Sequence, residues 1–106
     1  MDEQAEANAR LATKQIRMEI NRLLLKWDPL CVKGLRGADR QYESEIAPLL
    51  ILVKKGANYM EIARHLHSTL TKTWKMPENK PMCVELGKKM YNIGALYRGE
   101  EPIKLS

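Results

Sequence analysis

The chain has 106 residues, of which 44 % are hydrophobic and 29 % are charged, and its formal net charge is +5. This size and composition predict one globular domain and exclude a disordered chain. The longest apolar run, Leu49 to Val53, is too short to cross a bilayer, so we expect no membrane partner. We predict a single helical domain over residues 1–106, with residues 1–8 and 99–106 as loose ends.

The cysteines and the N-terminus indicate a compartment. Cys31 and Cys83 stand far apart and do not form a Cys-x-x-Cys pair. The segment from Met1 to Asn8 is acidic and lacks the basic start and apolar core of a secretory signal. We therefore predict a cytoplasmic protein in which both thiols are free.

The first predicted helix covers about residues 8–27. Apolar residues recur there at spacings of three and four, which places them on one helical face. These residues are Ala9, Ala12, Ile16, Ile20, Leu23, Leu24 and Trp27. Met18 and Leu25 fall outside this face, which indicates either a helix covered on more than one side or a second contact surface.

The segment Trp27-Asp28-Pro29 ends this helix, because a residue before proline is disfavoured in the helical conformation. Asp28 before Pro29 also has the pattern of an N-cap, which predicts a short turn at Leu30 to Val32 whose N–H groups Asp28 satisfies. Two interpretations stay open for the segment: an exposed binding corner, or a core tryptophan followed by a capping aspartate. We favour the structural one. A glycine-containing loop follows, with Lys33, Arg36 and Arg40 exposed.

The second predicted helix covers about residues 45–55. Its apolar stripe consists of Tyr42, Ile46, Leu49, Leu50 and Val53. Two lysines and Gly56 form a typical C-terminal signal. Because proline inside a helix costs about 3 kcal/mol, Pro48 conflicts with an early start. We therefore favour a start between Ser44 and Ala47, with Asp39 to Glu43 as a separate turn.

Two more helices are predicted, over about residues 59–73 and 80–97. Asn58-Tyr59-Met60-Glu61 has the capping-box pattern of a helix start. In the last helix, Gly87 and Gly94 are seven residues apart and lie on a similar side. Because glycine weakens a helix, we infer that another helix approaches closely there.

The combined pattern predicts an all-α fold, a compact bundle of four helices joined by short loops. The stripes of the four helices together define the expected core. Its residues are Ile16, Ile20, Leu23, Trp27, Tyr42, Ile46, Leu50, Ile62, Leu66, Leu86, Met90 and Ile93.

The titratable residues do not form a recognisable catalytic or metal site. His65 and His67 lie about 200° apart around a helix axis, so they cannot chelate one metal ion. Asp39, Glu43 and Glu45 cluster in sequence, but a solvated face explains them better than acid–base chemistry. No nucleophile motif or phosphate-binding loop is present. We predict a protein that is not an enzyme and uses no cofactor or metal.

Nucleic-acid binding is the main alternative, favoured by the positive charge and by Glu61-Ile62-Ala63-Arg64-His65-Leu66. That string resembles the first helix of a helix-turn-helix, which would occupy about residues 59–75. Its turn would fall at His67-Ser68, where no glycine is found. The basic residues are spread along the whole chain, which is typical of an ordinary solvated surface.

Several segments in the same order resemble a known family: Trp27-Asp28-Pro29-Leu30-Cys31-Val32, Tyr42-Glu43, Pro48-Leu49-Leu50, Gly56 and Glu61 to Leu66. The family consists of small bacterial helical domains of unknown function that carry W-D-P-[ILM]-G-V after the first helix. The similarity covers about residues 16–75. Cys31 stands where the family usually has Gly, and the fourth helix matches poorly. The resemblance implies a compact helical bundle and no catalytic residues; similar domains occur among suspected immunity and accessory proteins.

We predict a non-enzymatic protein-interaction domain, of the immunity or accessory type, whose protein partner the sequence does not identify. The oligomeric state is also left open. The candidate partner-binding residues lie on the second face of the first helix and in the segment that follows it. They are Met18, Leu25, Trp27, Asp28, Lys33, Arg36 and Arg40.

Overall fold

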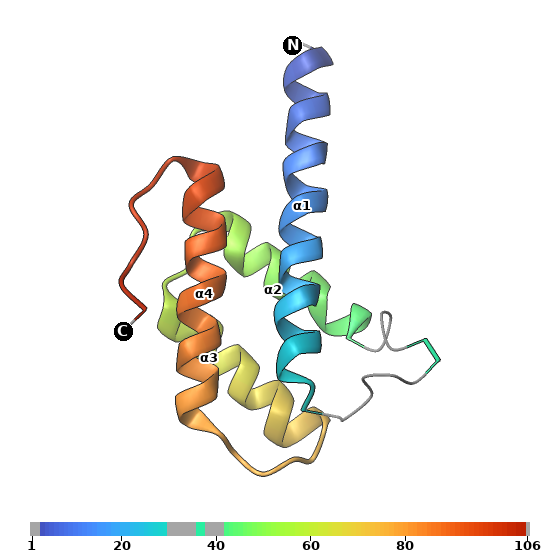
Figure 1. The fold of residues 1–106 in the computed structure, drawn as a ribbon, viewed down its shortest axis with the longest axis vertical. Helices are drawn as coiled ribbons and strands as arrows, with labels where there is room; N and C mark the ends of the chain where they lie inside the picture. Colours follow the sequence, from blue (N-terminus) through green and yellow to red (C-terminus); the bar gives the residue numbers. More distant parts are fainter. Residues whose placement is uncertain (1–2, 30–35, 38–41, 106) are drawn as a thin grey trace.

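A computed structural model describes residues 3–29, 36–37 and 42–105 of the chain. These residues form an all-helical bundle, with no strand among them (Figure 1). The elements are α1 (Glu3–Trp27), α2 (Glu43–Lys55), α3 (Tyr59–Ser68), a π-helical turn η2 (Thr69–Thr73) and α4 (Lys80–Arg98). The predicted all-α fold with four helices is confirmed.

Helix α1 begins at Glu3, so the predicted start near residue 8 is wrong. Alanine and glutamate favour a helix without an apolar stripe, and Glu3 and Glu6 in the first turn suit the N-terminal end of the helix dipole. Extending an existing helix is much easier than nucleating one, so the anchored part of α1 supports this extension. The extension projects beyond the rest of the bundle (Figure 1).

The end of α1 is joined to the start of α2 through Asp28. Its φ angle of 49° lies in the left-handed region, and its N–H donates to the Leu24 carbonyl over 2.7 Å. Its carboxylate accepts a hydrogen bond from the hydroxyl of Tyr42 at 2.9 Å. Tyr42 is fully buried and packs edge-on against Trp74, with ring centroids 5.4 Å apart. The turn predicted at residues 30–32 lies outside the described residues.

Helix α2 begins at Glu43, before the predicted window of Ser44 to Ala47, and contains Pro48 in its interior. The N–H groups of Glu45 and Ile46 already donate to the Tyr42 carbonyl, at 3.0 and 3.2 Å. Pro48 therefore does not prevent the helix from starting early. A proline removes one backbone hydrogen bond and crowds the preceding turn, and the rest of the buried helix compensates for that loss.

Helix α3 begins where predicted, because the Asn58 side chain accepts a hydrogen bond from the N–H of Glu61 at 3.0 Å. Its backbone then continues through Ser68 and Thr69 in the right-handed helical conformation and into η2. The turn expected at His67-Ser68 does not form, so residues 59–75 do not have helix-turn-helix geometry.

The predicted close approach at the two glycines of α4 is confirmed, with a different neighbour at each. A Cβ on Gly87 would lie 2.5 Å from the Tyr59 carbonyl oxygen of α3. A Cβ on Gly94 would lie 2.7 Å from the Val53 carbonyl oxygen of α2. These distances are too short for any side chain, so glycine lets α4 contact the backbones of both helices.

Most of the predicted core is confirmed. The residues that are buried as predicted are Ile16, Ile20, Tyr42, Ile46, Ile62, Leu66, Leu86 and Met90. Four others, Leu23, Trp27, Leu50 and Ile93, are only partly buried and pack against the core. Within the predicted stripes, Leu24 is buried rather than its neighbour Leu23, and Leu49 rather than its neighbour Leu50.

The C-terminal tail returns along α4 (Figure 1). The Asn92 side chain holds it: its amide N donates to the Ile103 carbonyl at 2.9 Å, and its Oδ1 accepts from the Ile103 N–H at 2.8 Å. Residues 99–105 are therefore anchored at one point rather than free along their length.

Candidate functional site

The candidate site is the outer face of α1, defined by Leu11, Gln15, Met18 and Arg22, together with Tyr97 of α4. The four α1 residues follow one another at spacings of four, three and four, so they lie along one side of the helix. Leu11 and Met18 are large apolar residues, yet 55 % and 58 % of their surface is exposed. The outer face thus presents two unburied apolar side chains two turns apart.

Tyr97 of α4 borders this face and is held there by a hydrogen bond. Its hydroxyl donates to Oε1 of Gln15 at 2.8 Å, which connects α4 to α1. Tyr97, Gln15, Met18, Glu19 and Arg22 surround a shallow hollow of about 280 Å³. The face therefore combines a projecting apolar helix with a concave part bounded by an aromatic ring.

The N-terminal end of the face lies where the neighbouring helices end. Gly56 and Gly99, with φ angles of 80° and 72°, terminate α2 and α4 in left-handed caps. Near these ends, residues of α2 and α4 line a hollow with α1 between Ala9 and Ile16. Every described side chain of α1 from Glu3 to Leu11 is exposed. The N-terminal part of α1 therefore extends past both neighbours.

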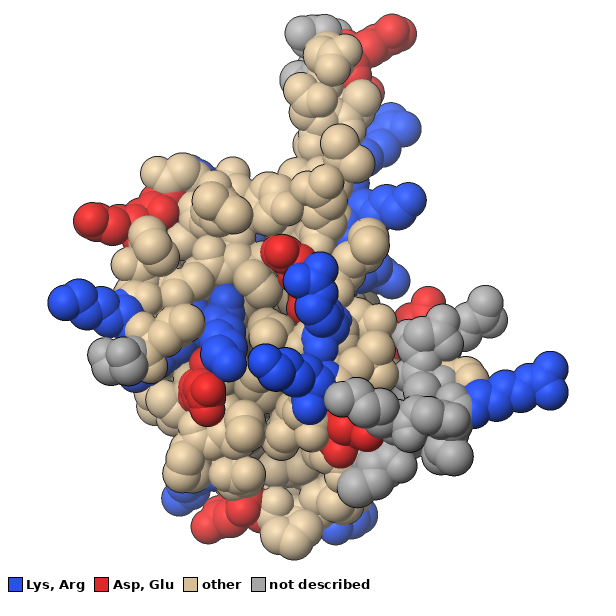
Figure 2. All heavy atoms as spheres, in the orientation of Figure 1, with Lys and Arg blue, Asp and Glu red and all other residues tan. Residues whose placement is uncertain are grey.

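Positive charge borders the outer face. Arg10, Lys14 and Arg17 are exposed and follow one another at helical spacing along the flank of α1, and Arg22 lies within the face. Glu19 is the only acidic residue between positions 10 and 22. Figure 2 shows basic side chains projecting along one side of α1, whereas both signs are interspersed over the rest of the visible surface. The surroundings of Leu11 and Met18 are therefore basic.

The candidate partner-binding residues predicted from the sequence lie in different parts of the structure. Met18 lies on the outer face, and Arg36 is exposed in a turn. Leu25 and Trp27 are partly buried against the core. Asp28 is the link to Tyr42. Lys33 and Arg40 lie outside the described residues.

Trp27 does contribute to a second hollow, between α1 and α4. This hollow has a volume of about 260 Å³ and is lined by Leu23, Lys26, Trp27, Met82, Glu85, Leu86 and Lys89. Lys89 and Glu85 pair with each other along α4, at 3.2 Å. Trp27 therefore lines this hollow and is partly buried, so it is not an exposed side chain that a partner could bind directly.

Of the outer face, the sequence identified only Met18; it did not identify Leu11, Gln15, Arg22 or Tyr97. Leu11 lies seven residues before Met18, a spacing that could have indicated a second stripe on α1. Tyr97 has no such signal, because it belongs to the apolar stripe of α4 and reaches α1 only through the fold.

The chemistry of the described residues is limited. Among them, no three His, Cys, Asp or Glu side chains come together in a way that could hold a metal ion. Cys83 is a free thiol, and burial raises its pKa, which favours the neutral, less reactive form. No helix in the described ranges is both long and apolar enough to cross a membrane.

No family model matches the sequence, and neither a curated protein nor a solved structure shows a significant match to the chain. The family resemblance suggested by Trp27-Asp28-Pro29 therefore stays a prediction. Function has to be inferred from the geometry and charge of the chain itself.

Proposed function

We propose that this protein is a non-enzymatic interaction domain that binds an acidic protein partner through the outer face of α1. The observation that carries this proposal is the exposure of Leu11 and Met18 on a helix that extends past its neighbours. Burying such a side chain in an interface contributes roughly 1.5–3 kcal/mol. Two anchors on one side of a helix fit the binding of an amphipathic helix in an apolar groove.

Charge supports an acidic partner. Arg10, Lys14 and Arg17 would face carboxylates at the rim of such a groove, and complementary charge mainly increases the association rate and the specificity. Leu11 and Met18 would supply most of the affinity, because desolvated apolar anchors dominate binding energy.

Nucleic acid is the competing partner. The same basic flank of α1 could contact phosphates, although the helix-turn-helix that would read bases does not form at residues 59–75. Phosphate binding weakens steeply with salt because counterions are released, whereas contact through Leu11 and Met18 does not. The salt dependence of binding therefore separates the two partners.

Affinity capture from native lysate tests the proposal, at low and moderate salt and with and without nuclease. The bait variants are Leu11→Ala combined with Met18→Ala, and Ile51→Ala as a matched control. Ile51 is 65 % exposed on α2, far from the outer face in sequence. We expect a protein that survives nuclease and moderate salt, is retained by Ile51→Ala and is lost with the double variant. Recovery of nuclease-sensitive material alone, or equal recovery by both variants, would contradict the proposal.

Two finer predictions accompany this function. An immunity or accessory role is supported by the resemblance at Trp27-Asp28-Pro29, and coexpression with a toxic partner should then restore growth. A cytoplasmic location is supported by Cys83, a buried free thiol. Fractionation of the source cells checks the location, and appearance of the protein outside the cytoplasm would contradict it.

A further inference from the structure

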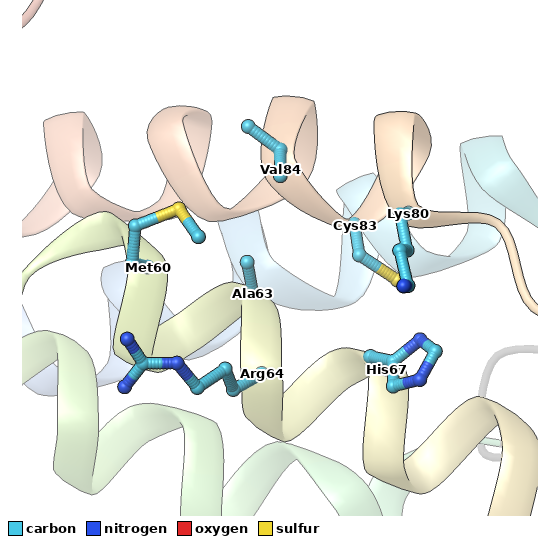
Figure 3. A pocket seen from close by; sticks show the side chains of 7 residues that line it. All are labelled: Met60, Ala63, Arg64, His67, Lys80, Cys83 and Val84. Atoms are coloured by element: carbon cyan, nitrogen blue, oxygen red, sulfur yellow. The ribbon is translucent and has the colours of Figure 1, made fainter.

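A pocket between α3 and α4 is separate from the outer face of α1. Its volume is about 260 Å³, just below the roughly 300–1,000 Å³ of typical ligand pockets. The α3 residues Met60, Ala63, Arg64 and His67 line one side, and the α4 residues Lys80, Cys83 and Val84 line the other. Figure 3 shows the two sets facing each other across the gap between the helices.

The interior of this pocket is apolar. Met60, Ala63 and Val84 supply hydrocarbon and thioether surface, and Cys83 is neutral because burial raises its pKa. Such walls favour a hydrocarbon or aromatic body and disfavour a sugar, whose hydroxyl groups would lose their hydration without gaining partners there. The small volume further excludes a nucleotide or a long lipid chain.

The polar groups of the pocket are all suited to an anion. Within the described part of the chain, Arg64, His67 and Lys80 are the polar side chains that line the pocket apart from the Cys83 thiol, and none of its lining residues carries a carboxylate. Nδ1 of His67 is buried and has no hydrogen-bond partner among the described residues. In Figure 3 the imidazole of His67 and the thiol of Cys83 point toward one another. An acceptor near His67 would satisfy a nitrogen that is costly to leave unpaired.

The start of α4 adds to this preference. Lys80 is the first residue of α4, and the first turn contains no acidic residue, whereas α1, α2 and α3 all have one there. A cation at a helix N-terminus opposes the helix dipole, and an anion relieves that conflict. The carboxylate of Glu78 lies 3.9 Å from Nε2 of His67 and is mostly exposed.

We propose that this pocket binds a small monocarboxylate with an apolar body, such as a medium-chain fatty acid. The body occupies the space between Met60, Ala63 and Val84. The carboxylate lies at the end of the pocket near His67 and Lys80, where it accepts hydrogen bonds from Lys80 or Nδ1 of His67, and Arg64 adds positive charge at the other end. This proposal does not depend on the function proposed for α1.

Titration of the ¹⁵N-labelled protein with octanoate, below its aggregation concentration, tests the proposal. Two compounds serve as controls. Acetate has the carboxylate without the apolar chain, and 1-octanol has the apolar chain without the carboxylate. We expect octanoate to shift amide signals of α3 and α4 selectively, and to bind about tenfold or more tightly than either control. Absence of binding, shifts centred on α1, or equal binding of 1-octanol would overturn the proposal.

Matched variants locate the site. Arg64→Gln with Lys80→Gln removes two exposed charges from the pocket, and Lys72→Gln with Lys104→Gln removes two exposed charges elsewhere. The first pair should weaken octanoate binding by about tenfold, and the second should leave it unchanged. Val84→Phe, which fills the pocket, should abolish binding while circular dichroism confirms the fold. Equal effects of the two charge pairs, or full binding by a folded Val84→Phe, would overturn the assignment.

Discussion

The α3–α4 pair and the N-terminal part of α1 are all regular helices, yet their side chains meet opposite environments. At Gly87, α4 touches the backbone of α3, so the facing side chains of both helices are covered. Leu11 and Met18 lie on a side of α1 that its neighbours leave largely uncovered, and α2 and α4 end in left-handed glycine caps near the level of Leu11. A helical residue becomes core or contact surface according to which side and which length of its helix the neighbours cover.

Truncating a core side chain to alanine should have the largest effect on the free energy of unfolding. These variants test which residues of the helices are packed in the core. Leu66→Ala and Leu24→Ala remove side chains that are 2 % and 0 % exposed, and each should lower the free energy of unfolding by about 2–5 kcal/mol. Leu23→Ala, at a partly buried position, should cost clearly less. Chemical denaturation measures all three. Equal losses at Leu23 and Leu24 would contradict the placement of Leu24, rather than Leu23, in the core.

Gly87→Ala should have the next largest effect on stability. Helix propensity alone predicts stabilisation of about 1 kcal/mol. A methyl group 2.5 Å from the Tyr59 carbonyl must instead push α3 and α4 apart, and we expect a net loss of about 1–3 kcal/mol. Thermal unfolding decides the sign, and a more stable variant would show that the two helices are not in backbone contact.

Tyr42→Phe should have a smaller effect. It removes the hydroxyl that donates to Asp28, while the ring keeps its place against Trp74. The loss should be about 0.5–1.5 kcal/mol, the usual net contribution of a hydrogen bond. Asp28→Ala, measured in the same denaturation series, should cost a similar amount. If both variants were as stable as the parent, the joint between α1 and α2 would not depend on this bond.

The double variant Leu11→Ala with Met18→Ala should have the smallest effect on stability. Both side chains are exposed, so the free energy of unfolding should stay within about 0.5 kcal/mol of the parent. Calorimetry checks this. A loss as large as that of Leu66→Ala would mean that the outer face of α1 is part of the core and is not a contact surface.

Helical periodicity was sufficient to predict the four helices and most of the core, because burial repeats with the helical period. It could not choose between Leu23 and Leu24 or between Leu49 and Leu50, since adjacent residues both fall within a broad apolar arc. The link between Asp28 and Tyr42 joins residues fourteen apart and has no local signal.

The candidate site was predictable only in part. Met18 was recognised because it breaks the main stripe of α1. The partly buried positions of Leu25 and Trp27, and the exposure of Leu11, depend on how α1 meets its neighbours, which is a tertiary property. The α3–α4 pocket likewise requires two helices in contact, although its α3 residues lie at helical spacing in the sequence.

Hydrogen exchange with and without the captured partner tests the central claim most directly. In the free protein, the amides near the N-terminus of α1 should exchange quickly and those of α3 and α4 slowly. On binding, the new protection should be centred on the segment from Leu11 to Arg22. New protection confined to α3 and α4, with α1 unchanged, would contradict the assignment of the outer face of α1 as the interaction surface.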